Sequence, residues 1–405
     1  MKNGKSVFGF SLLFYLIVIS FVSAQTTEQG VRDSTVTMGI LCPLSGPYSS
    51  VGANFLDGIQ TFLSHVNDIG GIHQRSIVLS PQDDGKDPDQ SMTAAQEMLG
   101  TGGVFGIISA SGIETTQALI DRGIRTEDIP VLVVGAFSKS SLSDIKTNTF
   151  TLGMPYRDQI VLAIEYLLKR NPETHFRMGL LFRDSFLGHE VEKGFHGVSN
   201  HYGLTVVGEE RYGTDTFDFI PSVNRLRSAG SDHVVLGATT WEVIQVMREA
   251  NGMGWVPQFI GTSANADPDM MVEAGEATDN YLVVDYLAKP WEKLPGVTLM
   301  LGNTQKYYPR KNTNALNRHH VLGYVSGLLV VEALRNAGRE LTREAFIDAL
   351  GRIETLNTHG LAGPVLYDRE SQLWRPAGRV FHFDWPSGRF LPVTDWAQPL
   401  IKVRP

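Results

Sequence analysis

The sequence predicts an α/β protein with two lobes, each built around a parallel sheet that helices cover on both faces. Short apolar runs typical of buried strands alternate with stretches whose apolar residues recur at helical spacing. This alternation pauses near Gly153 and then resumes, which predicts a second unit of the same kind. The length of 405 residues is sufficient for two or three domains.

The first series opens with an apolar run at 36–41, which predicts a strand. Apolar residues at helical spacing follow over 55–66, and Gly70 and Gly71 predict the end of that helix. The segment 87–90 reads Asp-Pro-Asp-Gln, which predicts a helix start with a capping aspartate and a proline in the first turn. The other predicted elements of this series are strands at 76–79, 104–108 and 130–134 and a helix over 115–121.

The second series repeats the alternation and then gives way to a helix-rich region. Its clearest late helix is predicted over 314–336, and a final hairpin is predicted to turn at 384–389. The predicted strands are 178–182, 205–208, 234–236, 259–260 and 281–285, and the predicted helices are 160–168, 191–201, 220–229 and 243–250.

The amino terminus has the pattern of a secretory signal peptide. Lys2 and Lys5 precede an apolar run at 7–22, and small residues reach Ala24, which predicts cleavage there and a periplasmic location. An uncleaved membrane anchor is the alternative, although the run is short for a full span. The sequence holds one cysteine, Cys42, so no internal disulfide can form, and its place at the end of an apolar strand predicts a small buried side chain.

The sequence lacks the residue patterns that several classes of function require. The net charge of −8 and the absence of a Lys/Arg run argue against a nucleic-acid partner. The loop 42–52 lacks the glycine patterns of phosphate-binding loops, and no Gly-x-Ser-x-Gly or His-Glu-x-x-His occurs. The acidic run 83–89 predicts turns and a helix cap, and the adjacent His319 and His320 are predicted to lie at the surface. We therefore expect no cofactor, no metal and no catalytic residues.

The carboxyl ends of the predicted strands carry hydroxyl, small and aromatic residues. Ligands of open parallel sheets bind at these ends, where helix N-termini favour a negative group and aromatic rings supply an apolar wall. The segments that follow the strands are 45–48, 109–112, 135–138, 184–186, 239–241 and 262–265.

Several longer stretches of the chain, taken in order, carry a resemblance to a known family. They are MGILCPLSGPYSSVGANFLDGIQ and the residues up to Leu99, then IPVLVVGAFSKSSLSD and TFTLGMPYRDQ, and finally GPVLYD followed by GRFLPV. Together they resemble the leucine/isoleucine/valine-type periplasmic binding proteins of ABC importers. This resemblance implies the type I periplasmic binding protein fold, with two Rossmann-like lobes joined by three crossovers near residues 152, 282 and 356. The implied boundaries are a signal peptide at 1–24, a first lobe of 34–152 plus 283–356, and a second lobe of 153–282 plus 357–405.

The same resemblance implies a ligand held between the lobes and the residues that line it. They are Tyr48, Ser111, Ile113, Ala136 and Ser138 from the first lobe, and Phe186, Thr239, Trp241 and Ser263 from the second. Amino-acid binders of this type carry an acid in a Gly-x-Glu turn, where this chain has Gly261-Thr262-Ser263. A buried ammonium without a carboxylate partner is costly, which favours an aromatic or short organic acid over an amino acid. Glu114 or Glu242 leaves an amino acid open, and amides are ligands of the family as well.

The sequence thus predicts an exported solute-binding protein that closes around a small organic ligand and delivers it to the permease of an ABC transporter. We expect a monomer. One alternative is a periplasmic sensing module for a separate signalling receptor. The other is an enzyme that uses the space between the lobes.

Overall fold

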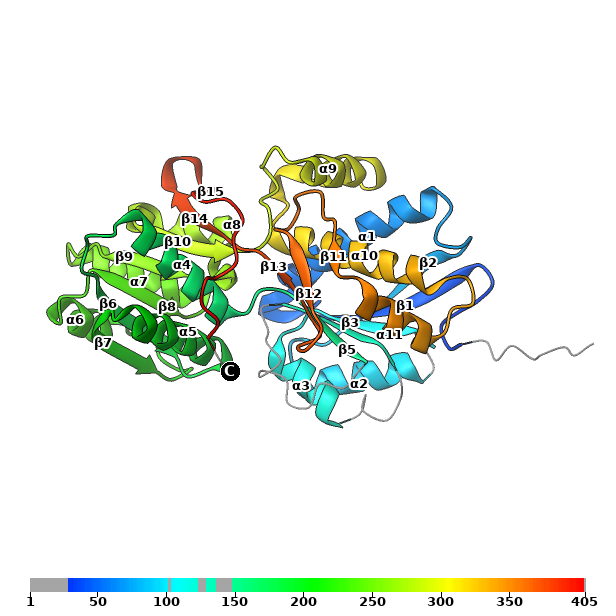
Figure 1. Ribbon diagram of the computed structural model, residues 1–405, viewed down its shortest axis with the longest axis horizontal. Helices are drawn as coiled ribbons and strands as arrows, with labels where there is room; N and C mark the ends of the chain where they lie inside the picture. Colours follow the sequence, from blue (N-terminus) through cyan, green and yellow to red (C-terminus); the bar gives the residue numbers. More distant parts are fainter. Residues whose placement is uncertain (1–27, 101–102, 123–128, 136–147, 404–405) are drawn as a thin grey trace, which may run out of the picture.

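The computed structural model describes residues 28–100, 103–122, 129–135 and 148–403, and in it the chain forms two α/β lobes side by side (Figure 1). One lobe is drawn in blue, cyan and orange, and the other in green with two red strands at its edge. The two-lobed α/β class predicted from the sequence is therefore confirmed. The predicted signal peptide at 1–24 and the predicted site residues Ala136 and Ser138 lie outside the described residues.

The first lobe is built on a sheet of eight described strands. Its spatial order is β11-β12-β13-β5-β4-β3-β1-β2, and the strands from β13 to β2 run parallel. The edge strands β11 and β12 are antiparallel to their neighbours, so the sheet is mixed. The strands are β1 (Thr35–Cys42), β2 (Ser76–Asp83), β3 (Gly106–Ser109), β4 (Val131–Val134), β5 (Thr149–Leu152), β11 (Thr355–Leu356), β12 (Val365–Asp368) and β13 (Leu373–Pro376).

The second lobe is built on a sheet of seven described strands. Its order is β15-β14-β10-β9-β8-β6-β7, in which β10 to β7 are parallel and the hairpin β14–β15 is antiparallel, as predicted for its turn at 384–389. The strands are β6 (Arg177–Arg183), β7 (Thr205–Tyr212), β8 (His233–Gly237), β9 (Gln258–Gly261), β10 (Tyr281–Asp285), β14 (Arg379–Asp384) and β15 (Arg389–Pro392).

Helices cover both sheets (Figure 1). The first lobe carries η1 (Gly46–Tyr48), α1 (Ser49–Asp68), α2 (Pro88–Leu99), α3 (Ile113–Arg122), α9 (Pro295–Tyr307), η6 (Thr313–Ala315), α10 (Arg318–Ala337) and α11 (Arg343–Arg352). The second carries α4 (Tyr156–Arg170), α5 (Phe186–Tyr202), α6 (Ile220–Ser228), α7 (Thr240–Gly252), η4 (Ser263–Asn265), α8 (Pro268–Met271), η5 (Val272–Thr278) and η7 (Trp385–Ser387).

Local signals fix several of the helix ends. Asp87 Oδ1 accepts from the N–H groups of Asp89 and Gln90, so the helix start predicted at 87–90 is confirmed. Gly70 and Gly71 follow α1 with φ of 107° and 71°, which is backbone that glycine adopts readily. The sequence predicted one late helix from 314. In the structure η6 and a break come first, and α10 starts at Arg318, directly after the capping residue Asn317.

The chain passes between the lobes after β5, after β10 and before β14 (Figure 1). The resemblance implied a third passage near 356, with 357–405 in the second lobe. Residues 365–376 instead form β12 and β13, and Leu373 and Trp374 pair with Thr151 and Leu152 of β5 in the first sheet. The third passage therefore lies between Pro376 and Arg379. The expected boundary was wrong because short strands at a sheet edge are fixed by partners far away in the chain.

Candidate ligand-binding site

The carboxyl ends of the parallel strands in each sheet face the other lobe. The chain leaves the first sheet at the end of β5 and the second sheet at the end of β10, and both ends lead directly into the other lobe. Strands β1, β3 and β4 run parallel with β5, and β6, β8 and β9 run parallel with β10. All of these strand ends therefore meet at the junction of the lobes, which is the edge where open parallel sheets bind ligands.

In the first lobe, Tyr48 presents its ring at the end of η1. Its side chain is exposed, and Lys86 Nζ lies 3.8 Å from the ring centroid. Asp83 holds the loops beneath them, since its Oδ1 accepts from the N–H groups of Leu44, Ser45 and Gly85 at 2.7, 3.2 and 2.9 Å. Partial burial raises the pKa of Asp83, but these hydrogen bonds outweigh it and leave that pKa below its usual value.

Ser111 and Ile113 follow β3, as the sequence predicted. Ser111 is only 3% exposed, and Ile113 is the first residue of α3. Cys42 at the end of β1 is fully buried, which confirms the expected small buried side chain. Burial and the nearby carboxylates of Asp84 and Asp83 raise the pKa of its thiol to about 12, so it is not a reactive thiolate at neutral pH.

In the second lobe, Phe186 reaches the opposite lobe. It starts α5 behind the capping residue Ser185, whose Oγ accepts from the Gly188 N–H. The Phe186 ring packs against a buried cluster of the first lobe that includes Leu41 and Met92. This apolar contact joins the two faces that the sequence assigned to the ligand.

Thr239 and Trp241 form the start of α7. The Thr239 N–H and hydroxyl both donate to Glu242 Oε2 at 2.8 Å, and Arg183 Nη1 donates to Glu242 Oε1 at 2.8 Å. Glu242 is buried and is engaged by the cap and by Arg183, so this one of the two carboxylates named for a ligand ammonium has other partners. Trp241 stays 42% exposed and meets the exposed Phe217 edge-to-face at 6.1 Å.

Ser263 lies in the turn after β9, where the sequence predicted the second lobe to touch a ligand. It is buried, and its N–H donates to Gln159 Oε1 of α4 at 2.7 Å. Thr262 caps this turn, and Asn265 Nδ2 donates to the Ala238 carbonyl at 2.9 Å. Neutral groups hold this turn. The amide side chain of Gln159 contacts Ser263, the residue that stands where amino-acid binders of this type carry an acid.

A buried ion cluster joins the lobes, and sequence reasoning missed it. Asp285 ends β10 and accepts from Lys289 Nζ at 2.6 Å and from Arg318 Nε and Nη2 at 3.0 Å, with Arg318 on α10 of the other lobe. Burial raises the pKa of Asp285, but the two cations outweigh this effect and hold that pKa well below its usual range. Asp285 closes a predicted strand at a crossover, which is the only signal that the sequence offered.

The paired histidines lie beside this cluster. His320 is fully buried, so the prediction of a surface position is wrong for it, and His319 is half-buried. The face of α10 that carries His320 is covered by α9, where Thr304 Oγ1 lies 3.3 Å from His320 Nε2. Burial, with the charges of Arg318 and Lys289, lowers the pKa of His319 to about 3.

Comparison with known proteins identifies the family. The family model described as "Periplasmic binding protein" matches residues 35–383. The chain belongs to the periplasmic binding proteins. It is 23% identical over 399 residues to the Leu/Ile/Val-binding protein homolog 8 of Brucella melitensis, covering 95% of this chain and 96% of the relative. The predicted resemblance to the leucine/isoleucine/valine-type binding proteins is thus confirmed.

Solved structures share the fold of this periplasmic binding protein. A branched-chain amino acid ABC transporter protein from Thermus thermophilus with bound valine has a TM-score of 0.77 at 19% identity and covers 91% of this chain and 98% of its own. The solute binding protein of an ABC transporter from R. palustris in complex with 4-hydroxybenzoate also has a TM-score of 0.77, at 17% identity, covering 90% and 98%. The description of the family model names binding proteins rather than enzymes.

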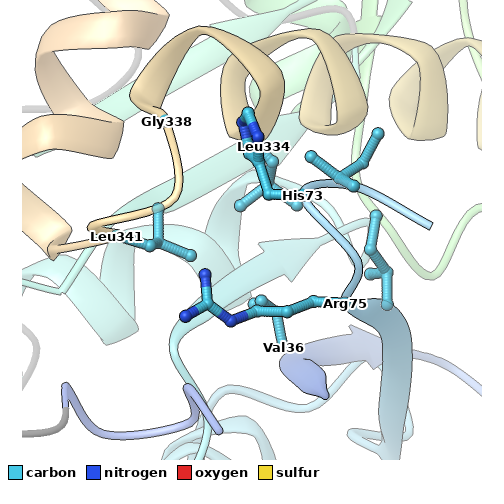
Figure 2. A pocket seen from close by; sticks show the side chains of 8 residues that line it. Val36, His73, Arg75, Leu334, Gly338 and Leu341 are labelled. Carbon is cyan, nitrogen blue, oxygen red and sulfur yellow. The ribbon is translucent and has the colours of Figure 1, made fainter. Parts of the chain in front are cut away.

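Other features of this binding protein lie away from the predicted site. A small hollow of about 10 Å³, about the size for one water, lies between the α1–β2 loop, β1 and the end of α10 (Figure 2). The polar side chains at its rim have hydrogen-bond partners, since Arg75 donates to the carbonyls of Arg32 and Arg339 and His73 Nε2 lies 3.0 Å from the Arg335 carbonyl.

Within the described ranges, no group of three or more His, Cys, Asp or Glu residues could hold a metal, and no helix could span a membrane.

Proposed function

We propose that this periplasmic binding protein captures a small organic acid between its lobes and delivers it to the permease of an ABC importer. The observation that carries the proposal is the meeting of both sets of strand ends at the junction of the lobes. Hydroxyl and aromatic residues follow these strand ends in the chain, among them Tyr48, Ser111, Phe186 and Trp241. Export by a cleaved segment 1–24, action as a monomer and the absence of catalysis are part of the proposal.

The ligand class follows from the charges that the second lobe does not offer. The Ser263 N–H faces Gln159 rather than an acid, and Glu242 is bound to Arg183 and to the cap of α7. A ligand ammonium would therefore lack a buried partner at these positions, which is costly. An aromatic or short organic acid avoids this cost, because its apolar part can contact the rings and its carboxylate can accept from hydroxyl and main-chain N–H groups. Relatives with valine and with 4-hydroxybenzoate show that the fold admits both classes.

Closure supplies the mechanism. A ligand that touches both lobes binds the closed arrangement better than the open one and shifts the population towards it. Phe186 already crosses to the first lobe, and Arg318 reaches Asp285 at the second passage of the chain. The closed surface would then be recognised by the permease.

The test is a thermal-shift screen of residues 25–405 with benzoate, 4-hydroxybenzoate, short aliphatic acids, their primary amides, valine and leucine. A ligand at 100 times its Kd stabilises by about 2.7 kcal/mol, which raises the Tm of a protein of this size by a few degrees. We expect acids to give the largest shift. A largest shift with amino acids would contradict the ligand class, and chemical change of the bound compound during prolonged incubation would contradict a pure binding function.

The Tyr48→Ala variant locates the site. We expect it to remove most of the ligand-induced shift, because the ring is 41% exposed beside Lys86 at the strand ends. Tyr202→Ala is the matched control, since Tyr202 is 39% exposed at the far end of α5. An equal ligand-induced shift in wild type and Tyr48→Ala would contradict the placement of the site.

A further inference from the structure

The side-chain amide of Gln159, in the first turn of α4, uses both of its ends inside the protein. Its Nε2 donates to the Met154 carbonyl at 2.7 Å, and its Oε1 accepts from the Ser263 N–H at 2.7 Å. A carbonyl can only accept and an N–H can only donate, so the two partners fix the direction in which the amide points. Gln159 is fully buried, so water does not compete for either bond.

One partner, Met154, lies in the first passage between the lobes. Strand β5 of the first sheet ends just before residues 153–155, and α4 of the second lobe starts just after them. The Gly153 N–H donates to the Trp374 carbonyl of β13 at 3.1 Å, which holds the start of the passage on the first sheet. The bond from Gln159 to the Met154 carbonyl therefore fastens the passage to the second lobe one residue later.

The other partner, Ser263, lies in the β9 turn, residues 262–265, at the junction of the lobes. Thr240 Oγ1 donates to the Ala264 carbonyl at 3.0 Å, so this turn is also fastened to the start of α7. Gln159 takes the Ser263 N–H, whereas the described residues offer the Ser263 hydroxyl no hydrogen-bond partner. The hydroxyl is therefore the group of Ser263 with which a ligand can form a hydrogen bond.

We propose that Gln159 is a positioning residue that couples the β9 turn to the first passage, so that a ligand bound at Ser263 favours closure of the lobes. This inference rests on the proposed function and on the contact of Ser263 with the ligand. A ligand that fixes Ser263 fixes the N–H group that holds Gln159 Oε1, and the same amide holds the Met154 carbonyl. The two ends of one amide group cannot move independently, so the positions of the turn and of the passage are linked in free energy.

The rival role for Gln159 is structural only. In that role the amide satisfies a buried N–H and a buried carbonyl and has no effect on closure. Both roles predict a loss of stability when the amide is removed, because buried main-chain groups without partners are costly. They differ in what a ligand does, since only a coupling residue links a contact at the β9 turn to the first passage.

Gln159→Met separates the two roles, because methionine has a similar length and shape and forms neither bond. Asn67→Leu is the matched control. Asn67 Nδ2 donates to the Ile77 carbonyl at 2.9 Å, and its Oδ1 accepts from the Ile77 N–H at 2.8 Å, so this amide also bridges a main-chain donor and acceptor. The control bridge lies within the first lobe at the amino end of β2, away from the junction. Both variants should lose stability in thermal unfolding.

The first measurement is hydrogen exchange of the wild-type protein, followed by mass spectrometry, with and without the compound of the thermal-shift screen that gives the largest shift. We expect this compound to slow exchange in peptides that cover the β9 turn and also in peptides that cover residues 153–157. Unchanged exchange in either segment overturns the proposal, and this result does not depend on the folding of a variant.

The second measurement is the Kd for the same compound by calorimetry, with hydrogen exchange of both variants. We expect Gln159→Met to raise the Kd about tenfold, a common size for coupling between two sites, and to lose the slowing at 153–157 while keeping that at the β9 turn. Asn67→Leu should keep the Kd and the exchange pattern of the wild type. A wild-type Kd in Gln159→Met, or an equal rise in Asn67→Leu, overturns the proposal.

The outcome for the proposed function is read separately. If an amino acid or an amide gives the largest thermal shift, the ligand class is wrong, and the same two measurements with that compound still decide the role of Gln159. If no compound of the screen binds to the wild-type protein, the proposed function fails and the coupling through Gln159 fails with it.

Discussion

Two glycines allow α1 and α10 to cross with their backbones in contact. A Cβ added at Gly323 would lie 2.0 Å from the Phe55 carbonyl oxygen, and one added at Gly58 would lie 2.0 Å from the His320 carbonyl oxygen. Both obstacles are backbone atoms, which cannot rotate away. This crossing places the first turn of α10, which carries Arg318 and His320, against α1 of the same lobe.

We therefore expect Gly323→Ala to destabilise the protein by about 1–3 kcal/mol, the usual cost of extra atoms in a packed core. Gly302→Ala is the control, because Gly302 lies in α9 with no atom within 4 Å of an added Cβ. That change should stabilise by about 0.4–1 kcal/mol. Urea unfolding followed by circular dichroism measures both, and the same sign for the two changes would contradict this account of the crossing.

Residue types alone could place the predicted site at strand ends but could not assign each hydroxyl its partner. Thr239 was expected to line the ligand, and its hydroxyl donates to Glu242 three residues later. Ser263 was expected there too, and its N–H faces Gln159, which is 104 residues away in the chain. The capping partner was readable from local spacing, whereas the partner of Ser263 depends on how α4 packs. Their contact with a ligand stays a prediction, as it does for Ala136 and Ser138.

At the scale of elements, the prediction succeeded where the signal is local. The cap at Asp87, the glycines after α1 and the turn at 384–389 act within a few residues, so the sequence shows them directly. Strands β12 and β13 have four residues each, and β12 joins the first sheet through β13, which pairs with β5 more than 200 positions earlier. The sequence pattern therefore could not assign them to the first lobe.

The first turn of α10 makes stability depend on pH. Burial lowers the pKa of His320 from its usual 6.5 to about 3, so the folded protein keeps this histidine neutral while the unfolded chain binds a proton below pH 6.5. The unfolded state then holds more protons, and stability falls as the pH falls through this window. Each such group contributes a slope of about 1.4 kcal/mol per pH unit.

His320→Gln should reduce the slope of unfolding free energy against pH between 6 and 4 by about this amount. Gln can still reach Thr304, so the fold should persist. His201→Gln, at an exposed histidine in the last turn of α5, should leave the slope unchanged. Denaturant unfolding at several pH values provides the measurement, and equal slopes in wild type and His320→Gln would show that His320 is accessible to protons in the folded state.

At the scale of the whole molecule, the lobes are joined by more than the three passages of the chain. Arg318 begins a first-lobe helix, and Asp285 ends a second-lobe strand, with Lys289 between them in the sequence. All three side chains are buried, and Lys289 also lies 4.8 Å from the Phe381 ring centroid in the second sheet. Because the cluster sits at a passage between the lobes, it fixes their separation at the point about which they must close.

Arg318→Met tests this junction with a side chain of related shape and no charge. It leaves the buried Asp285 with Lys289 as its remaining described cation, and the loss of the hydrogen bonds that Arg318 donates to this carboxylate costs about 1.5–3 kcal/mol. The exposed pair of Arg352 and Asp348 provides the control, since Arg352→Met removes a surface contact worth about 0–1 kcal/mol.

We expect Arg318→Met to lower the urea midpoint of unfolding strongly. It should also broaden the distribution of interatomic distances that small-angle scattering gives for the ligand-free protein, because the lobes would no longer be held at one separation. The loss should be largest at neutral pH and shrink in acid, since the lowered pKa of Asp285 gives the cluster its full effect only above the usual range of an aspartate. Equal midpoints for Arg318→Met and Arg352→Met would mean that the covalent crossovers alone set the arrangement of the lobes.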